Sequence, residues 1–154
     1  MTSSSASKEK SVREILVVAI SSPILIGVYE DGVLSQTFSS QKHASEALID
    51  FLPQVANEPI ASVTYANGPG SFMGLKVAYT TLKTFCDARG VELFAASGFE
   101  FCSAIKSNGG FCFTLNAGEV RLEKRAPSEV VLPQNLSSVK RLSELLPNYI
   151  LDAV

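Results

Sequence analysis

A glycine-rich decapeptide carries the residue types of this sequence that are best suited to binding chemistry. It reads Asn67-Gly68-Pro69-Gly70-Ser71-Phe72-Met73-Gly74-Leu75-Lys76. Its glycines permit positive φ angles or close backbone approach, and its serine is suited to capping a helix whose first amides bind an anion. The chemistry that this spacing suggests is phosphate binding, with Gly68, Gly70, Ser71 and Gly74 as the contacting residues.

Two general phosphate-binding motifs match this loop only in part. A Walker A loop requires Gly-x4-Gly-Lys-Ser/Thr, and neither Gly68 nor Gly70 has a glycine at the required later position. A dinucleotide fingerprint requires Gly-x-Gly-x-x-Gly, and Gly74 comes one residue too late for it. The alternative is a tight turn whose glycines let a helix pack closely on a sheet. Both interpretations stay open at this level.

Candidate residues for catalysis are few. His43 is the only histidine, and a Ser-His-acid site would need Ser71 or another serine beside it. The alternative for His43 is an ordinary residue at a helix N-terminus. The sequence holds no Gly-x-Ser-x-Gly elbow that would support a hydrolase.

Three cysteines without a Cys-x-x-Cys pair argue against zinc and disulfides, and we expect buried reduced thiols at Cys86, Cys102 and Cys112.

Bulk composition bounds the function further. With 154 residues and 46% hydrophobic content, the chain suits one small globular protein. A net charge of -2 and a pI near 5.4 give no basic footprint for nucleic acid. The sequence shows no apolar run long enough for a membrane helix and no signal peptide, so we expect no membrane association and a cytoplasmic location.

The flanking pattern places the glycine loop between a strand and a helix. Residues 61–66 are β-branched and apolar, as in a buried strand. After the loop, apolar residues recur at helical spacing to about Arg89, and Gly90 stops the pattern. Elsewhere we expect antiparallel strands at 14–20, 24–29 and 33–38, helices at 42–56, 98–106 and 136–146, and strands at 91–96, 111–116, 119–123 and 129–132. Pro53 favours a kink or an early end near Leu52 in the helix over 42–56.

Taken whole, the decapeptide resembles the Gly-Pro-Gly-Ser-Phe-Thr-Gly-Leu/Val-Arg signature of the bacterial TsaB family, also called YeaZ. Met73 stands where threonine is usual, and Lys76 where arginine is usual. The element order over residues 14–105 is similar to the first half of the actin-like ATPase superfamily to which TsaB belongs. The resemblance implies an α/β actin-like (ASKHA, RNase H-like) lobe with a mixed five-stranded sheet at 13–107. A disordered tail at 1–12 and a truncated second lobe at 108–154 complete this division.

The resemblance also implies a function. TsaB is a non-catalytic scaffold that pairs with TsaD through the first two helices, while a TsaE-type ATPase joins the assembly. TsaD makes N6-threonylcarbamoyladenosine at adenosine 37 of tRNA, so this chain would contact tRNA only indirectly. The matching interface positions here are Leu48, Phe51, Leu52, Phe72, Leu75, Tyr79 and Leu82. The alternative is that these apolar lines are core, and the same helices offer a homodimer surface when no partner is present.

Superfamily enzymes carry an acidic residue just after the first strand, where it positions metal and phosphate. Ser21 occupies that position here, and a hydroxyl does not replace the charge that attracts Mg²⁺. The His-x-x-x-His metal pair of TsaD needs more histidines than this chain has. We therefore expect no catalytic site and no cofactor of its own, with ATP or ADP only at a partner interface. The rival functions are a nucleotide-binding enzyme and a glycoprotease-like peptidase.

Overall fold

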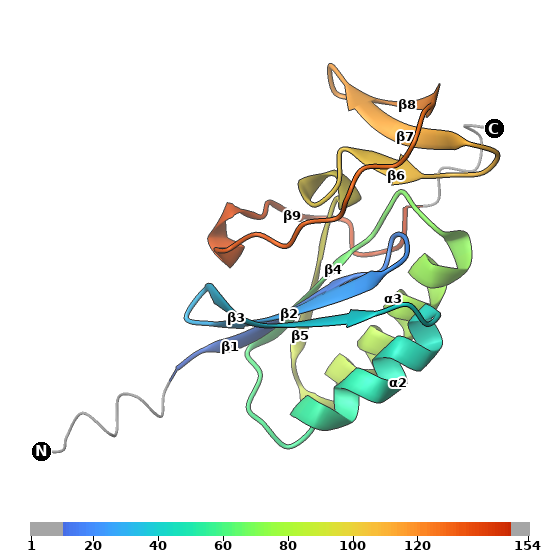
Figure 1. Cartoon of the computed structure of the whole chain (residues 1–154). Coiled ribbons are helices and arrows are strands. Elements are labelled where there is room, and N and C mark those ends of the chain that lie inside the picture. The colour runs from blue at the N-terminus through green and yellow to red at the C-terminus, as the bar shows by residue number, and fades with distance from the viewer. Residues whose placement is uncertain (1–10, 149–154) are drawn as a thin grey trace, which may run out of the picture.

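The structure is a computed structural model that describes residues 11–148. Its strands form two sheets, a six-stranded sheet of order β3-β2-β1-β4-β5-β9 and a three-stranded sheet of order β6-β7-β8. Figure 1 shows the smaller sheet standing above the larger one, with two long helices side by side below the larger sheet. None of the described helices is long and apolar enough to cross a membrane.

The first three strands form the antiparallel meander that the sequence predicts. β1 (Arg13–Val18) pairs with β2 (Ile24–Glu30), which pairs with β3 (Val33–Ser40). Asp31 and Gly32 both have positive φ, 53° and 82°, as a two-residue hairpin turn with the strand twist requires.

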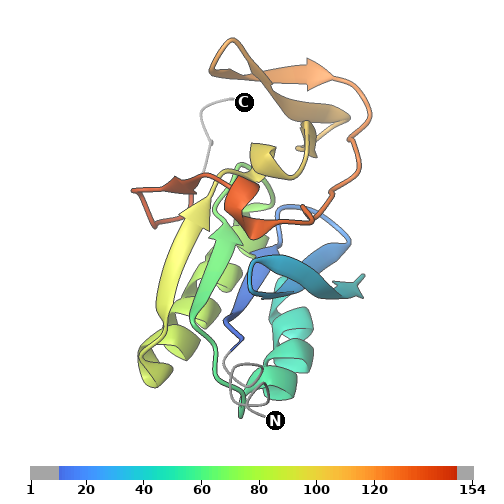
Figure 2. The same cartoon turned by 90° about the vertical axis from the view of Figure 1, so that its left-hand side faces the viewer.

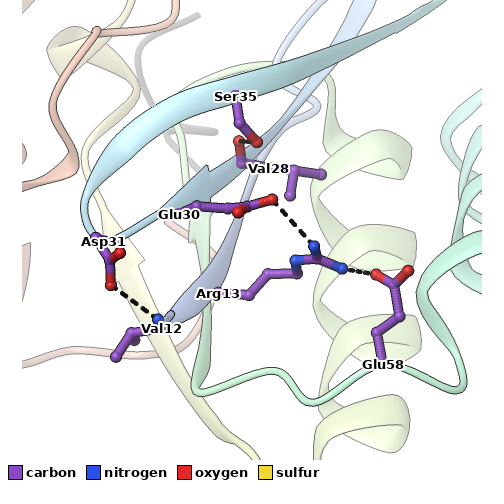
Figure 3. A network of polar contacts seen from close by, with 7 residues as sticks. All are labelled: Val12, Arg13, Val28, Glu30, Asp31, Ser35 and Glu58. Atoms are coloured by element: carbon purple, nitrogen blue, oxygen red, sulfur yellow. Dashed lines mark hydrogen bonds and ion pairs between the residues drawn. The ribbon is translucent and has the colours of Figure 1, made fainter. Parts of the chain in front are cut away.

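Polar contacts fasten the start of β1 to its neighbours (Figure 3). The amide of Val12 donates to the Asp31 carboxylate at 2.9 Å. The Arg13 guanidinium forms an ion pair with Glu30 at 3.0 Å and another with Glu58. These contacts join the hairpin and the segment before β4 to the beginning of the central strand.

Two crossover helices add the parallel strands. α2 (Ala44–Val55) connects β3 to β4 (Ser62–Ala66), and α3 (Phe72–Arg89) connects β4 to β5 (Glu92–Ala96). β1, β4 and β5 run parallel, and both helices cover the same face of the sheet (Figures 1 and 2). Pro53 does not end α2, which continues to Val55, while Gly90 at φ 68° ends α3 as predicted.

Each face of the six-stranded sheet has its own core. The residues of β1 and of the loop after it contribute alternately to the two cores, because successive side chains of a strand point to opposite faces. The helix-side core includes Ile15, Val17 and Ala19 with Leu48, Phe51, Leu82 and Cys86 from the helices. The opposite core includes Leu16, Val18 and Ile20 with Tyr29, Leu75, Phe101, Ile105, Phe113, Leu132 and Leu136.

The helix predicted at 98–106 is wrong. The chain there makes one 3-10 turn, η1 (Gly98–Glu100), and then the short strand β6 (Ala104–Lys106). The buried residues Phe101, Cys102 and Ile105 mimic helical spacing, but long-range pairing overrides it, because β6 pairs antiparallel with β7 (Phe111–Asn116). The hairpin of β7 and β8 (Glu119–Lys124) is present as predicted.

Two further predictions in the C-terminal part are wrong. Residues 129–132 form no strand, because Leu132 fills the opposite core while Val131 donates a single backbone hydrogen bond to Phe101 at 2.9 Å. In place of the helix at 136–146 the chain forms a 3-10 turn, η2 (Leu136–Ser138), and the strand β9 (Arg141–Leu142). β9 pairs antiparallel with the edge of β5. A helix over these residues could not form this pairing.

The two sheets do not divide at one point of the chain. β6 precedes residue 107 yet pairs in the smaller sheet, and β9 follows it yet pairs in the larger sheet. The division into lobes at 13–107 and 108–154 stays a prediction. Of the tail expected at 1–12, all but the last two residues lie outside the described part of the chain.

Candidate functional site

A cleft of about 950 Å³ lies where α2 and α3 begin. β3 and β4 both run parallel to β1, so the helices that follow them start at the same end of the sheet. The cleft is lined by the loop after β1, the residues before and at the start of α2, the segment Gly70–Gly74 and the loop after β6. The structure therefore brings Gly70, Ser71 and Gly74 together with Ser21 and His43.

The glycines of the loop allow close backbone packing. A Cβ atom on Gly70 would lie 2.6 Å from the carbonyl oxygen of Ile20, and one on Gly74 would lie 2.9 Å from that of Ala19. Gly68 has a φ of 127°, and a Cβ there would lie 2.5 Å from the carbonyl oxygen of Asn148. The loop thus fits tightly against the residues that follow β1 and against the C-terminal segment. This packing accounts for the glycines without a bound phosphate.

Several amides at the start of α3 already have protein partners. The Ser71 amide donates to the Ile20 carbonyl at 3.0 Å, and the Gly74 amide donates to the Ser71 hydroxyl oxygen at 3.2 Å. Ser71 therefore caps α3 as predicted. The phosphate-binding role of Gly68, Gly70, Ser71 and Gly74 stays a prediction, and these bonds leave only part of the first turn for a ligand.

The charged side chains that line the cleft are cationic. Lys42 forms an ion pair with Asp50 at 2.8 Å, and this hydrogen bond raises the pKa of the lysine. Lys106 is exposed, and none of the residues lining the cleft is an aspartate or glutamate. Within residues 11–148 no cluster of three or more His, Cys, Asp or Glu side chains is placed to hold a metal ion. The cleft offers an anion positive charge but offers Mg²⁺ no carboxylate.

His43 and Ser71 lie on the same cleft but form no assembled catalytic site. His43 is the residue before α2, and its side chain makes no capping hydrogen bond. In the described part of the chain, no hydrogen bond links its imidazole to a serine or a carboxylate. A nucleophile activated by a base requires such a contact. The geometry here gives the peptidase alternative no support.

Most of the interface positions expected on the helices are buried. Leu48, Phe51, Leu75 and Leu82 are each 3% exposed or less, so they belong to the cores and a partner does not reach them. This corrects the prediction for these four positions, because the helices turn their continuous apolar lines toward the sheet. Leu52 and Tyr79 are half-buried, and Phe72 is 44% exposed.

Two exposed apolar residues on the helices were missed by the sequence reasoning. Ile49 of α2 is 68% exposed and Met73 of α3 is 61% exposed. Ile49 lies off the buried stripe of α2, and that displacement was the available signal. Met73 replaces the threonine that is usual in the signature, and this substitution was the available signal there.

The C-terminal segment is bound to the end of β4, which the sequence reasoning also missed. The Asn67 side-chain amide donates to the carbonyl of Leu146 at 3.1 Å, and the Asn148 amide donates to the carbonyl of Asn67 at 2.6 Å. The Tyr65 hydroxyl donates to the carbonyl of Leu145 at 2.6 Å. Asn67 is 2% exposed, so this polar residue serves to hold the returning chain.

The three cysteines are free and buried, as predicted. Burial raises the pKa of the Cys86 thiol to about 11. A thiol with so high a pKa is largely protonated at neutral pH and is a poor nucleophile or metal ligand.

No protein-family model matches the sequence, and no curated protein matches it. Two structures from Pseudomonas aeruginosa are among the solved structures that share its architecture. One is an uncharacterized protein with similarity to peptidase YeaZ from Pseudomonas aeruginosa, at 14% identity and a TM-score of 0.52 over 73% of this chain and 63% of that chain. The other is YeaZ from Pseudomonas aeruginosa, at 15% identity and a TM-score of 0.50 over 79% of this chain and 71% of that chain.

The chain has the fold of YeaZ. The expected α/β actin-like lobe is therefore confirmed, with β9 as a sixth strand beyond the five predicted. At 14–15% identity the likeness concerns the fold alone. The chain spans 63% of the length of the first of these structures, so activity, substrates and partners require separate arguments.

Proposed function

We propose that this chain is a non-catalytic subunit of the TsaB type that binds a TsaD-family partner during N6-threonylcarbamoyladenosine modification of tRNA. The observation that carries the proposal is a YeaZ fold with the Gly-Pro-Gly-Ser-Phe signature at its β4–α3 turn. The cleft beside that turn lacks the carboxylate that metal-dependent phosphate chemistry needs, since Ser21 follows β1. A binding role fits these residues better than a catalytic one.

The binding surface we propose is the outer helix face, which comprises Ile49, Met73, Thr80 and Thr84. Ile49 and Met73 offer exposed apolar contact area. The Thr80 hydroxyl donates to the carbonyl of Lys76 at 3.0 Å, and the Thr84 hydroxyl donates to the carbonyl of Thr80 at 2.8 Å. Because these hydroxyls are satisfied within α3, a partner that covers them leaves no donor unpaired. Small side chains here also permit close approach of a second helix.

The partners we expect are a TsaD-family protein in a heterodimer and a TsaE-type ATPase in the larger assembly. tRNA binds elsewhere in that assembly, because the chain has a net charge of -2 and a pI near 5.4. A homodimer forms when no partner is present. ATP or ADP, where it binds, occupies the cleft of Lys106 and Ser71 and draws its metal ligands from the partner.

Co-elution tests this proposal. Size-exclusion chromatography of the chain with the TsaD-family protein of the same organism, with TsaE and nucleotide supplied, is expected to give a complex. Separate elution at micromolar concentrations would mean that this chain shares the fold of YeaZ but does not bind the proposed partner.

The rivals have tests of their own. Tight binding of ATP by the isolated chain would favour the nucleotide-binding enzyme, for which the cationic cleft is the supporting observation. Proteolysis that is abolished in Ser71→Ala would favour the glycoprotease-like peptidase. We expect neither activity in the isolated chain.

A further inference from the structure

Strand β8 is the free edge of the three-stranded sheet. It pairs with β7 on one side only, and Figure 1 shows it as the strand of that sheet farthest from the rest of the molecule. All six of its residues, Glu119–Lys124, are exposed or half-exposed. An edge strand of this kind presents unpaired backbone groups that another strand can bind.

The hairpin turn fixes which backbone groups face outward. Ala117 and Gly118 have φ values of 54° and 84°, which defines a two-residue turn and makes Asn116 and Glu119 a hydrogen-bonded pair. The odd-numbered residues therefore bond to β7, and the Arg125 amide continues this phase by donating to the Gly110 carbonyl at 3.2 Å. The backbone groups of Val120, Leu122 and Lys124 point to the open edge, where no described residue binds them.

The charges of β8 are complementary to themselves. Glu119, Arg121, Glu123 and Arg125 share one face, because they lie at alternate positions. If a second copy pairs antiparallel with Leu122 opposite Leu122, then Glu119 lies opposite Arg125 and Arg121 lies opposite Glu123. These are non-hydrogen-bonded pairs, in which cross-strand side chains lie closest.

Neighbouring registers lack this match. A shift by two residues in one direction places Arg121 opposite Arg121 and Glu119 opposite Glu123. A shift by two residues in the other direction places Glu123 opposite Glu123 and Arg121 opposite Arg125. Both registers bring like charges together. A shift by one residue places outward backbone groups against inward ones, so the ladder does not form. Both the hydrogen-bond phase and the charges therefore select the same two-fold arrangement.

We propose that a second copy of this chain binds edge to edge along β8 and joins the two three-stranded sheets into one continuous sheet. Val120, which is 38% exposed, then lies opposite Lys124 of the second copy, whose aliphatic stem covers it. Leu122 meets its own copy on the two-fold axis. The ion pair of Arg121 with Glu119 at 3.3 Å becomes part of a four-charge network across the edge.

Sedimentation equilibrium of the full chain with charge swaps tests this interface. Wild type is expected to dimerise, and R121E and E123R are each expected to raise the dimer Kd at least about tenfold, since each brings like charges together. The double variant R121E/E123R restores the match and is expected to return the Kd close to the wild-type value. K140E, an exposed charge change outside the three-stranded sheet, is the matched control and is expected to leave the Kd unchanged.

A second variant tests the backbone contact. Val120→Pro removes an outward amide that the hairpin itself does not use, and we expect it to weaken the dimer while circular dichroism shows an intact fold. A monomer at every concentration would overturn the proposal. So would a dimer that is indifferent to the charge swaps, which would place the contact on another surface such as the outer helix face. Binding of a TsaD-family partner to R121E is expected to be unchanged, so the two proposals fail separately.

Discussion

The two faces of the six-stranded sheet are covered in different ways. On one face, two regular helices supply Leu48, Phe51, Leu82 and Cys86 to the helix-side core. On the other, 3-10 turns, extended segments and the smaller sheet cover the opposite core (Figure 2). On this second face, for example, the Tyr29 hydroxyl donates a hydrogen bond to the carbonyl of Pro133 at 2.7 Å, across a sequence separation of 104 residues. Local periodicity organises the first face, and distant single contacts organise the second.

The largest expected effects compare one leucine from each face. Leu82 of α3 is fully buried, and we expect Leu82→Ala to lower the free energy of unfolding by about 4 kcal/mol, because rigid helices leave a cavity. Leu132 lies in an extended segment that is freer to collapse, so Leu132→Ala should cost about 2 kcal/mol. Urea denaturation measures both. Equal losses would remove the distinction between the two faces.

The glycine loop lies where the two cores meet, and its packing gives the next effect. We expect Gly70→Ala to cost about 2 to 3 kcal/mol, since the added Cβ meets the backbone of Ile20. The matched control is Gly90→Ala, where nothing lies within 4 Å and only the φ of 68° is unfavourable, at a cost of about 1 kcal/mol. Thermal unfolding of the two variants checks the order. A harmless Gly70→Ala would show that the close approach to Ile20 is absent.

The third comparison concerns one titratable group on each face. Burial raises the pKa of Cys86 from 9.0 to about 11 in the helix-side core and that of Tyr29 from 10.0 to about 12 in the opposite core. Both groups stay protonated longer in the folded chain than in the unfolded one. Their contribution is therefore complete below the unfolded pKa and is lost as the pH rises through the folded pKa.

Stability is thus expected to fall between pH 9 and 11 through Cys86 and between pH 10 and 12 through Tyr29. Urea denaturation at a series of pH values measures this. Cys86→Ala should flatten the first interval and Tyr29→Phe the second, although Tyr29→Phe also removes the bond to Pro133 at all pH values. A variant that keeps the wild-type slope would show that the buried group is not the cause.

The same contrast explains what the sequence predicted. Strands β1 to β5 and helices α2 and α3 follow from apolar periodicity, the Asp31-Gly32 turn and the stop at Gly90, all of which are local signals. The prediction of a helix at 98–106 was wrong because Phe101 and Ile105 are apolar in order to be buried against the sheet face opposite the helices, not to form a helical stripe. The predictions for the segments after residue 128 were wrong for a similar reason, since β9 forms by pairing with the edge of β5.

The candidate site was predicted in part. The decapeptide indicated the loop and the serine cap, but not the cleft beside them. It did not distinguish buried from exposed positions on the helices, so Leu48 and Leu82 were placed on a surface while Ile49 was overlooked. When a helix has two apolar faces, its sequence does not show which face packs against the sheet and the neighbouring helix.

Calorimetric titration of a TsaD-family protein with three variants tests the central claim most directly. Ile49→Arg and Thr80→Arg place charges on the outer helix face, and Val131→Arg is the matched control, because Val131 is 61% exposed but lies away from α2 and α3. We predict that the first two variants raise the Kd at least about tenfold while the control keeps the wild-type value. Wild-type affinity in both helix variants, or an equal loss in all three, would contradict a TsaB-type interface on α2 and α3.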